Sequence, residues 1–279
     1  MQPAIEHVSD TALLVAACRA RETERSDGFV RDPFAERLAG ERGMAIAKSF
    51  PSIAWMEFGI GIRCVFMDEL LRLALADGVD TVLNLGAGLD SRPWRMDLPR
   101  DLRWIEVDFP DMLRYKAAAL GDAEPRCRLE RISADLNNAS ERAHILQQAS
   151  GGKALLITEG LLMYLPGATV ESLADEARSH GFAHWLLDIS SPALMRQAHG
   201  QLLDSINSVR NEGHLEGEQV AAAIEKHGWT EAQRRTYITD GTRLAEARIA
   251  RARASGEIKL NPNAPPPVDD GSGIRLYRA

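Results

Sequence analysis

Short apolar runs alternate with helical patterns along most of the chain. The apolar runs predict strands at residues 81–85, 103–109, 126–132, 153–160, 184–190, 234–239 and 273–277. Apolar residues at helical spacing predict helices at 11–23, 60–77, 110–120, 138–150, 167–180 and 218–227. Strands that alternate with helices are typical of an α/β fold with a mainly parallel sheet. We therefore predict one α/β domain over residues 1–279.

The first predicted strand ends in a turn that only small residues allow. Residues 81–85 lead directly into Gly86 and Gly88. Glycine accepts backbone conformations closed to other residues and lets a ligand approach the backbone closely. In an α/β sheet, the crevice at the carboxyl end of the first strand is the usual nucleotide site. The pattern indicates a nucleotide-like cofactor.

An arginine shares the apolar face of the helix that precedes this strand. Arg63 falls in line with Phe66, Met67, Leu70 and Ala74, whereas Asp68, Glu69 and Arg72 fall on the opposite face. A buried guanidinium needs an anionic partner. The pattern alone favours an ordinary salt bridge, and a ligand carboxylate is the functional alternative.

Acidic residues stand where the next strands end. Asp108 follows Gly86 by about 20 positions, the spacing at which an acid reaches ribose hydroxyls. Asp135, beside Leu136, and Glu159 end the third and fourth strands. Capping of the next helix is the structural alternative for Asp108, and a turn-forming role is the alternative for Asp135. Taken together with the glycine turn, these residues predict one site at the carboxyl edge of the sheet.

Composition narrows the class of protein. With 33 basic and 40 acidic residues, the formal charge of -7 argues against nucleic acid as the main partner. Cys18, Cys64 and Cys127 are odd in number and widely spaced in apolar surroundings, so we expect buried thiols rather than disulfides or metal ligands. The sequence shows neither a signal-peptide pattern nor an apolar run of bilayer length, so we expect a soluble, cytoplasmic protein that binds no membrane.

The residue types at the predicted site favour S-adenosylmethionine over a dinucleotide. The turn has Ser91 where the dinucleotide fingerprint has its third glycine. S-adenosylmethionine offers a ribose to Asp108, an adenine edge to Asp135 and a carboxylate to Arg63. A NAD-dependent oxidoreductase stays open as the alternative function.

The same residues resemble the leucine carboxyl methyltransferase family, in particular its bacterial branch, which includes polyketide O-methyltransferases. The similarity runs from about residue 9 to 190 and is carried by Ala17-Cys-Arg-Ala-Arg-Glu-Thr23, Arg31-Asp-Pro-Phe34, Leu83-Asn-Leu-Gly-Ala-Gly-Leu-Asp-Ser-Arg92, Glu106-Val-Asp-Phe-Pro110, Ser133-Ala-Asp-Leu136 and Glu159-Gly-Leu-Leu-Met-Tyr-Leu165. The eukaryotic members also have a lysine in the N-terminal helix, where this chain has Arg19, Arg21 and Arg25.

The resemblance implies a class I methyltransferase fold with a Rossmann-like sheet of seven strands, the last antiparallel. It implies an N-terminal helical lid (1–58), a cofactor-binding core (59–190), and an insertion after strand five that opens a region of substrate-covering helices and final strands (191–279). The implied cofactor is S-adenosyl-L-methionine. The implied contacts are Arg63 to the methionine carboxylate, Gly86 to the methionine portion beside Gly88, Asp108 to the ribose, Asp135 and Leu136 to the adenine, and Glu159 to the methionine amino side.

The reaction expected from this resemblance is transfer of a sulfonium methyl group to an oxygen of a small molecule. A carboxylate acceptor is already ionised at neutral pH, whereas a phenol needs a base. Tyr164 follows strand four and is a candidate to orient the acceptor, with core packing as the alternative. A relative that binds the cofactor without catalysis also remains open, His199 and His214 have no assigned role, and the sequence does not indicate an oligomeric state.

Overall fold

Seven strands form one sheet with helices on both faces. The computed structural model describes residues 8–50, 53–190, 213–254 and 268–279. Its strands are β1 (Thr81–Leu85), β2 (Arg103–Asp108), β3 (Arg128–Ser133), β4 (Ala154–Thr158), β5 (His184–Ile189), β6 (Thr230–Thr236) and β7 (Gly273–Arg278). Its helices are α1 (Val8–Glu24), α2 (Ala35–Ser49), α3 (Ile53–Ala76), α4 (Arg92–Arg95), α5 (Pro110–Leu120), α6 (Ala139–Ala149), α7 (Gly167–Ser179), α10 (Glu218–Lys226) and α11 (Thr239–Ala254), with a short 3₁₀ turn, η1 (Leu162–Tyr164).

The order of the strands places a crevice beside β1. The sheet runs β3-β2-β1-β4-β5-β7-β6, and β7 is antiparallel to both of its neighbours. β1 pairs with β2 on one side and with β4 on the other, so the strands that follow β1 in the chain are added first on one side of it and then on the other. Such a reversal point is where α/β sheets bind ligands at the carboxyl ends of their strands. The predicted seven-stranded α/β sheet with an antiparallel last strand is confirmed.

Alternate residues of the central strands pack into two separate cores. Val82 belongs to the core under α3, whereas its neighbour Leu83 belongs to the core under α6, α7 and α10. Leu186 and Leu187 of β5 divide in the same way. Both faces of a parallel sheet are covered, so its strands are apolar throughout rather than alternating with polar residues. This is why β1 and β4 are buried at every position.

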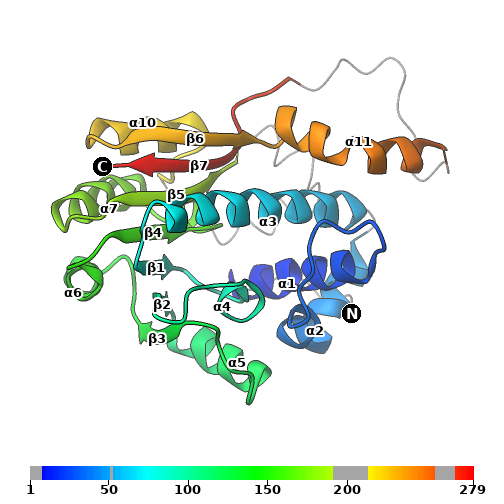
Figure 1. Ribbon diagram of the computed structural model, residues 1–279, viewed down its shortest axis with the longest axis horizontal. Coiled ribbons are helices and arrows are strands. Elements are labelled where there is room, and N and C mark those ends of the chain that lie inside the picture. The colour runs from blue at the N-terminus through cyan, green and yellow to red at the C-terminus, as the bar shows by residue number, and fades with distance from the viewer. Residues whose placement is uncertain (1–7, 51–52, 191–212, 255–267) are drawn as a thin grey trace.

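The N-terminal helices lie beyond the carboxyl edge of the sheet. In Figure 1, α1 and α2 sit beside the ends toward which the arrows of β1 and β4 point. Their apolar residues pack with the start of α3 and with Trp94 and Leu120 in a third core. A buried ion pair also anchors α1, because Arg248 of α11 places Nη2 2.8 Å from Oε1 of the fully buried Glu22. Arg248 lies over the rings of Phe29 and Phe58 as well.

Two predicted boundaries and one predicted helix face are wrong. Helix α3 begins at Ile53 rather than residue 60, and β6 is Thr230–Thr236 rather than 234–239 because the chain enters α11 at Thr239. Asp68, assigned to the polar face of its helix, is 7% exposed. Arg92 and Arg95 of α4 pack against that face and pair with its carboxylate. The spacing of residues within one helix could not predict this packing.

The three cysteines are buried and free, as predicted. Within the described ranges, none of the helices combines the length and apolar character needed to cross a bilayer. The insertion predicted after strand five lies largely outside the described residues, and so does His199.

A buried ion pair beneath the sheet gives a test of stability. The side chains of Lys116 and Glu106 are fully buried, with Nζ 2.7 Å from Oε1. Glu106→Gln removes the charge that compensates Lys116, so we expect it to lower the free energy of unfolding by about 3–5 kcal/mol in urea titrations. The matched control is Glu130→Gln, which breaks the partly exposed pair with Arg103 and should cost less than about 1 kcal/mol. Equal effects of the two substitutions would contradict this account.

Candidate functional site

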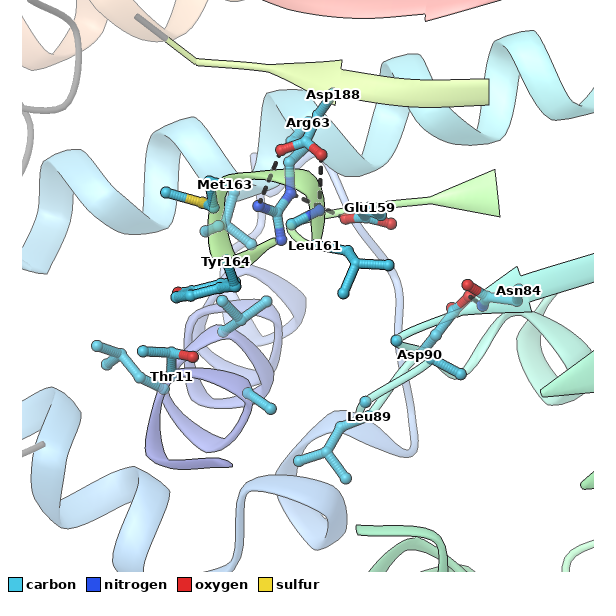
Figure 2. A pocket seen from close by; sticks show the side chains of 18 of the residues that line it. Thr11, Arg63, Asn84, Leu89, Asp90, Glu159, Leu161, Met163, Tyr164 and Asp188 are labelled. Carbon is cyan, nitrogen blue, oxygen red and sulfur yellow. Dashed lines mark hydrogen bonds and ion pairs between the residues drawn. The ribbon is translucent and has the colours of Figure 1, made fainter. Parts of the chain in front are cut away.

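One large cavity opens at the carboxyl edge of the sheet. It has a volume of about 990 Å³ and is lined by the ends of β1, β2, β4 and β5, together with residues of α1 and α3. Every residue predicted for the site lines it, namely Arg63, Gly86, Gly88, Asp108, Asp135, Leu136, Glu159 and Tyr164. Figure 2 shows Arg63, Glu159 and Asp188 on one side of this space and Thr11 and Tyr164 on another.

The glycine turn closes one end of the cavity with exposed backbone. Gly86 and Gly88 have φ angles of 63° and 43°, in the left-handed region that favours glycine. A Cβ at Gly86 would also come within 2.9 Å of Leu161 Cδ1. Gly88 donates its N–H to Asp108 Oδ2 at 2.7 Å, which ties the turn to the end of β2. A larger residue at Gly86 would be both strained and crowded.

Asp108 is held by backbone groups and does not cap a helix. Its Oδ1 accepts a hydrogen bond from Phe109 N at 2.7 Å, and Phe109 is itself the N-cap residue of α5. Burial raises the pKa of the Asp108 carboxyl, although the two backbone N–H groups act in the opposite direction. A carboxylate fixed in this way keeps lone pairs for hydroxyl groups in the cavity.

A cluster of buried charges forms another part of the cavity wall. Arg92, only 2% exposed, donates through Nε to Asp68 at 2.7 Å and through Nη1 to Asp90 at 3.0 Å and Glu159 at 2.7 Å. Arg63 places Nε 2.8 Å from Glu159 Oε1. That contact lacks hydrogen-bond geometry, so in the described part of the chain the buried Nε of Arg63 has no hydrogen-bond acceptor.

The carboxylates of this cluster have pKa values that move in opposite directions. Burial tends to raise the pKa of Glu159, but the charges of Arg92 and Arg63 outweigh it and lower the pKa overall. The pKa of Asp188 is raised, because burial is the larger effect there and Arg63 only partly offsets it. Asp188 therefore has less positive charge near it than Glu159.

Asp135 and Leu136 form the wall beside β3. Asp135 is exposed, and its Oδ1 accepts a hydrogen bond from Asn137 N at 2.9 Å, the turn predicted as its structural alternative. Leu136 is 7% exposed and presents apolar surface. The two residues combine a polar edge with an apolar face, which suits a planar heterocycle.

Aromatic and apolar side chains line the remainder of the cavity. They come from three parts of the chain that are far apart in sequence: the first turns of α3, the turn after β4, and the segment after β6. The members are Trp55, Met56, Phe58, Met163, Tyr164, Tyr237 and Ile238. Tyr164 ends the 3₁₀ turn η1 and is partly buried. Packing among distant segments leaves no local signal in the sequence, so of these residues only Tyr164 was predicted.

The arginines of α1 and Arg25, just after it, are bound to protein groups. Arg19 donates through Nε to Asp32 Oδ2 at 2.9 Å and through Nη2 to Leu89 O at 2.7 Å. Ser91 also donates to Asp32, at 2.6 Å. Arg19 lines the cavity, whereas Arg21 pairs with Glu57 and Arg25 with Asp27. Of the three, Arg19 joins α1 to the loop after β1.

His214, left without a role above, contacts Glu216 at 3.2 Å and does not line the cavity. Sequence reasoning also missed Asp90, Arg92 and Asp188. Asp90 and Arg92 belong to the glycine-turn motif, and that position is a sequence feature that could have pointed to them. For Asp188 the only such feature is an acid near the end of a predicted strand.

Comparison with known proteins agrees with this architecture. The sequence profile of leucine carboxyl methyltransferase matches residues 12–178, more than half of the chain. The chain belongs to the leucine carboxyl methyltransferase family. The match takes in most of α1 and every residue predicted for the site.

Similar proteins have been named from bacteria. A protein of Frankia alni named "Putative S-adenosyl-L-methionine-dependent methyltransferase" is 38% identical over 59% of this chain and 62% of its own length. A Streptomyces avermitilis protein with the same description is 38% identical over 58% of this chain and 62% of its own. The chain thus matches less than two thirds of the length of these relatives.

Solved structures share the fold at low sequence identity. A DUF574 family protein of Streptomyces avermitilis superimposes with a TM-score of 0.60 at 13% identity, covering 94% of this chain and 96% of that one. A protein of Thermobifida fusca YX described as a "putative methyltransferase" gives a TM-score of 0.56 at 18% identity, covering 99% and 95%. The shared fold therefore continues beyond residue 178, where the family match ends.

The charge cluster predicts how acid affects folding. Burial would raise the pKa of Asp90, but the charges of Arg92 and Lys116 outweigh it and hold the pKa at about 2. Because this pKa lies below the ordinary value of about 4, the ionised carboxylate stabilises the fold. The contribution is complete above about pH 4 and is lost as the pH falls toward 2. Asp90→Asn should lower the free energy of unfolding at pH 7 by roughly 2 kcal/mol or more.

Urea titrations at several pH values test this. The difference between wild type and Asp90→Asn should shrink as the pH falls from about 4 to about 2. Asp122→Asn, at an exposed position, is the control and should show no such trend. A wild-type advantage that stays constant over this range would overturn the assignment.

Proposed function

We propose that this protein is an S-adenosylmethionine-dependent methyltransferase that methylates an oxygen of a small molecule. The observation that carries the proposal is Arg63: its buried Nε has no hydrogen-bond acceptor in the described structure, and it lies in the same cavity as Gly86 and Asp108. An arginine with spare donor capacity is suited to a carboxylate. S-adenosylmethionine has one, whereas NAD does not.

The remaining cavity residues fit the other parts of this cofactor. Asp108, whose carboxylate is already oriented by two backbone N–H groups, would accept hydrogen bonds from the ribose hydroxyls. Leu136 and Asp135 would contact the adenine ring and its polar edge. Gly86 and Gly88 would allow the methionine chain close to the backbone, and Glu159 would lie on its amino side.

The loop after the glycine turn argues against a dinucleotide. A dinucleotide site places a pyrophosphate at the N-terminus of the helix that follows the turn. Here that helix, α4, has only four residues, and Ser91 before it is 1% exposed and bound to Asp32. The family relationship supports the same choice.

Catalysis in this proposal depends on position and on the exclusion of water. When bound, the cofactor supplies a methyl group on a sulfonium, which is already a good leaving group. Arg63 and Asp108 would hold the cofactor on either side of its sulfonium, and α1 would cover the space between them, so that an acceptor oxygen could approach in line with the methyl group. Residues 1–58 would serve as the lid, 59–190 as the cofactor-binding core, and 191–279 would help to cover the acceptor.

The cavity favours an apolar acceptor with one reacting oxygen. Among the described residues that line it, the cationic side chains are Arg19, Arg63, Arg92 and Arg95, and each lies against a carboxylate of the protein. Aromatic residues such as Trp55, Phe58 and Tyr237 supply much of the other surface. A small-molecule carboxylate or phenol suits this lining. The three buried thiols fit a reducing, cytoplasmic setting.

Arg63→Ala tests the cofactor site. Because charge-assisted hydrogen bonds contribute roughly 1.5–3 kcal/mol, we expect S-adenosylmethionine to bind at least about tenfold more weakly by titration calorimetry. Arg72→Ala, at an exposed position of the same helix, should bind as the wild type does, and NAD should bind neither protein. Unchanged affinity in a folded Arg63→Ala variant would return Arg63 to a structural role.

Labelled-methyl transfer to a panel of carboxylates and phenols tests the acceptor. We expect an aromatic acceptor to be labelled. If Tyr164 orients its oxygen through the hydroxyl group, Tyr164→Phe should lower the rate by at least about tenfold while cofactor affinity stays the same. Transfer to nitrogen or sulfur acceptors alone would contradict O-methylation. An unchanged rate in Tyr164→Phe would assign that residue to packing.

A further inference from the structure

Asp188 differs from the other carboxylates of the buried charge cluster. The cluster contains Arg63, Arg92 and Arg95, together with Asp68, Asp90, Glu159 and Asp188. Asp68 accepts from Arg92 and Arg95, and Asp90 accepts from Arg92. Glu159 accepts from Arg92 at 2.7 Å and lies 2.8 Å from Arg63. Four acids therefore share three arginines, which leaves one negative charge in excess.

The excess charge is located at Asp188. Its Oδ1 accepts from Gly160 N at 2.6 Å, and its Oδ2 lies 3.8 Å from Arg63 Nη1, too far for a hydrogen bond. The side chain is only 7% exposed. The other ionisable groups that face it are Glu159 from the end of β4 and Tyr237 from the segment after β6.

The cavity reaches this carboxylate. Asp188 lines it beside Arg63, Gly160 and Ser190, and Figure 2 shows its carboxylate pointing toward Arg63 at the boundary of the space. A buried carboxylate with incomplete compensation is costly unless a cation joins it. Burial accordingly raises its pKa, whereas the pKa values of Asp68, Asp90 and Glu159 are all lowered.

The neighbouring charges indicate which cation would bind. Arg63 offers spare donors and Asp188 spare acceptors, so the pair presents a positive and a negative group side by side. An α-amino acid has the complementary pair, a carboxylate next to an ammonium. We propose that Asp188 is a cofactor-binding residue that accepts a hydrogen bond from the ammonium group of the methionine end. This inference rests on the proposed function, and it adds Asp188 to Glu159 on the amino side of the ligand.

Two analogues of S-adenosylhomocysteine separate the two halves of this recognition. One lacks only the amino group and the other lacks only the carboxylate. Calorimetry with the intact chain measures all three ligands against wild type, Asp188→Asn and Arg63→Ala. Asparagine keeps the oxygen that accepts from Gly160 but removes the charge. Asp175→Asn, at an exposed position of α7, is the matched control.

We expect Asp188→Asn to bind S-adenosylhomocysteine at least about tenfold more weakly, and to bind the analogue without the amino group as the wild type does. Arg63→Ala should bind S-adenosylhomocysteine more weakly than the wild type does. With the analogue that lacks the carboxylate, Arg63→Ala and the wild type should bind equally. The control should resemble wild type with every ligand. If Asp188→Asn does not fold in a thermal unfolding assay, Asp188→Ser takes its place.

Two results would overturn the inference. One is an equal loss for ligands with and without the amino group, because Asp188 would then shape the cavity without binding the ammonium. The other is a loss specific to the amino group in Glu159→Gln but not in Asp188→Asn. In both cases the wild type still binds S-adenosylhomocysteine, so the proposed function stands. If the wild type binds none of the three ligands, the proposed function fails as well.

Discussion

A single buried guanidinium holds the carboxyl edge of the sheet together. Arg92 pairs with Asp68 of α3, with Asp90 of the loop after β1 and with Glu159 after β4. These three segments form the walls of the cavity, and their relative positions depend on this one side chain. A charge buried in this way is stable only while all its partners remain. The rigidity expected of the site and the acid sensitivity expected of the fold therefore have the same physical origin.

Much of the architecture could be predicted from sequence because a parallel sheet imposes strong constraints. Its strands are buried on both faces and read as apolar runs, and their carboxyl ends meet at one edge. Gly86, Asp108 and Glu159 could therefore be assigned to one site although they are distant in sequence. The start of α3 at Ile53 and the extent of β6 were less predictable, because packing against the N-terminal helices and β7 extends these elements beyond their local patterns.

The parts that escaped prediction depend on contacts between separate elements. The helical pattern assigned Asp68 to a polar face, and only the packing of α4 explains its burial. The roles of Arg92 and Asp188 follow from charges contributed by other strands and helices. The aromatic lining joins Trp55, Tyr164 and Tyr237, which no spacing rule connects. Sequence indicated where a cofactor binds, whereas the acceptor side required the folded arrangement.

Arg63 and Asp108 hold the methionine carboxylate and the ribose of one cofactor in the proposed function. A crystal structure of the protein with S-adenosylhomocysteine tests this claim most directly. We predict the methionine carboxylate on the Arg63 guanidinium, the ribose hydroxyls on the Asp108 carboxylate and the adenine beside Leu136. A ligand bound elsewhere, or bound in this cavity with its carboxylate away from Arg63, would contradict the account.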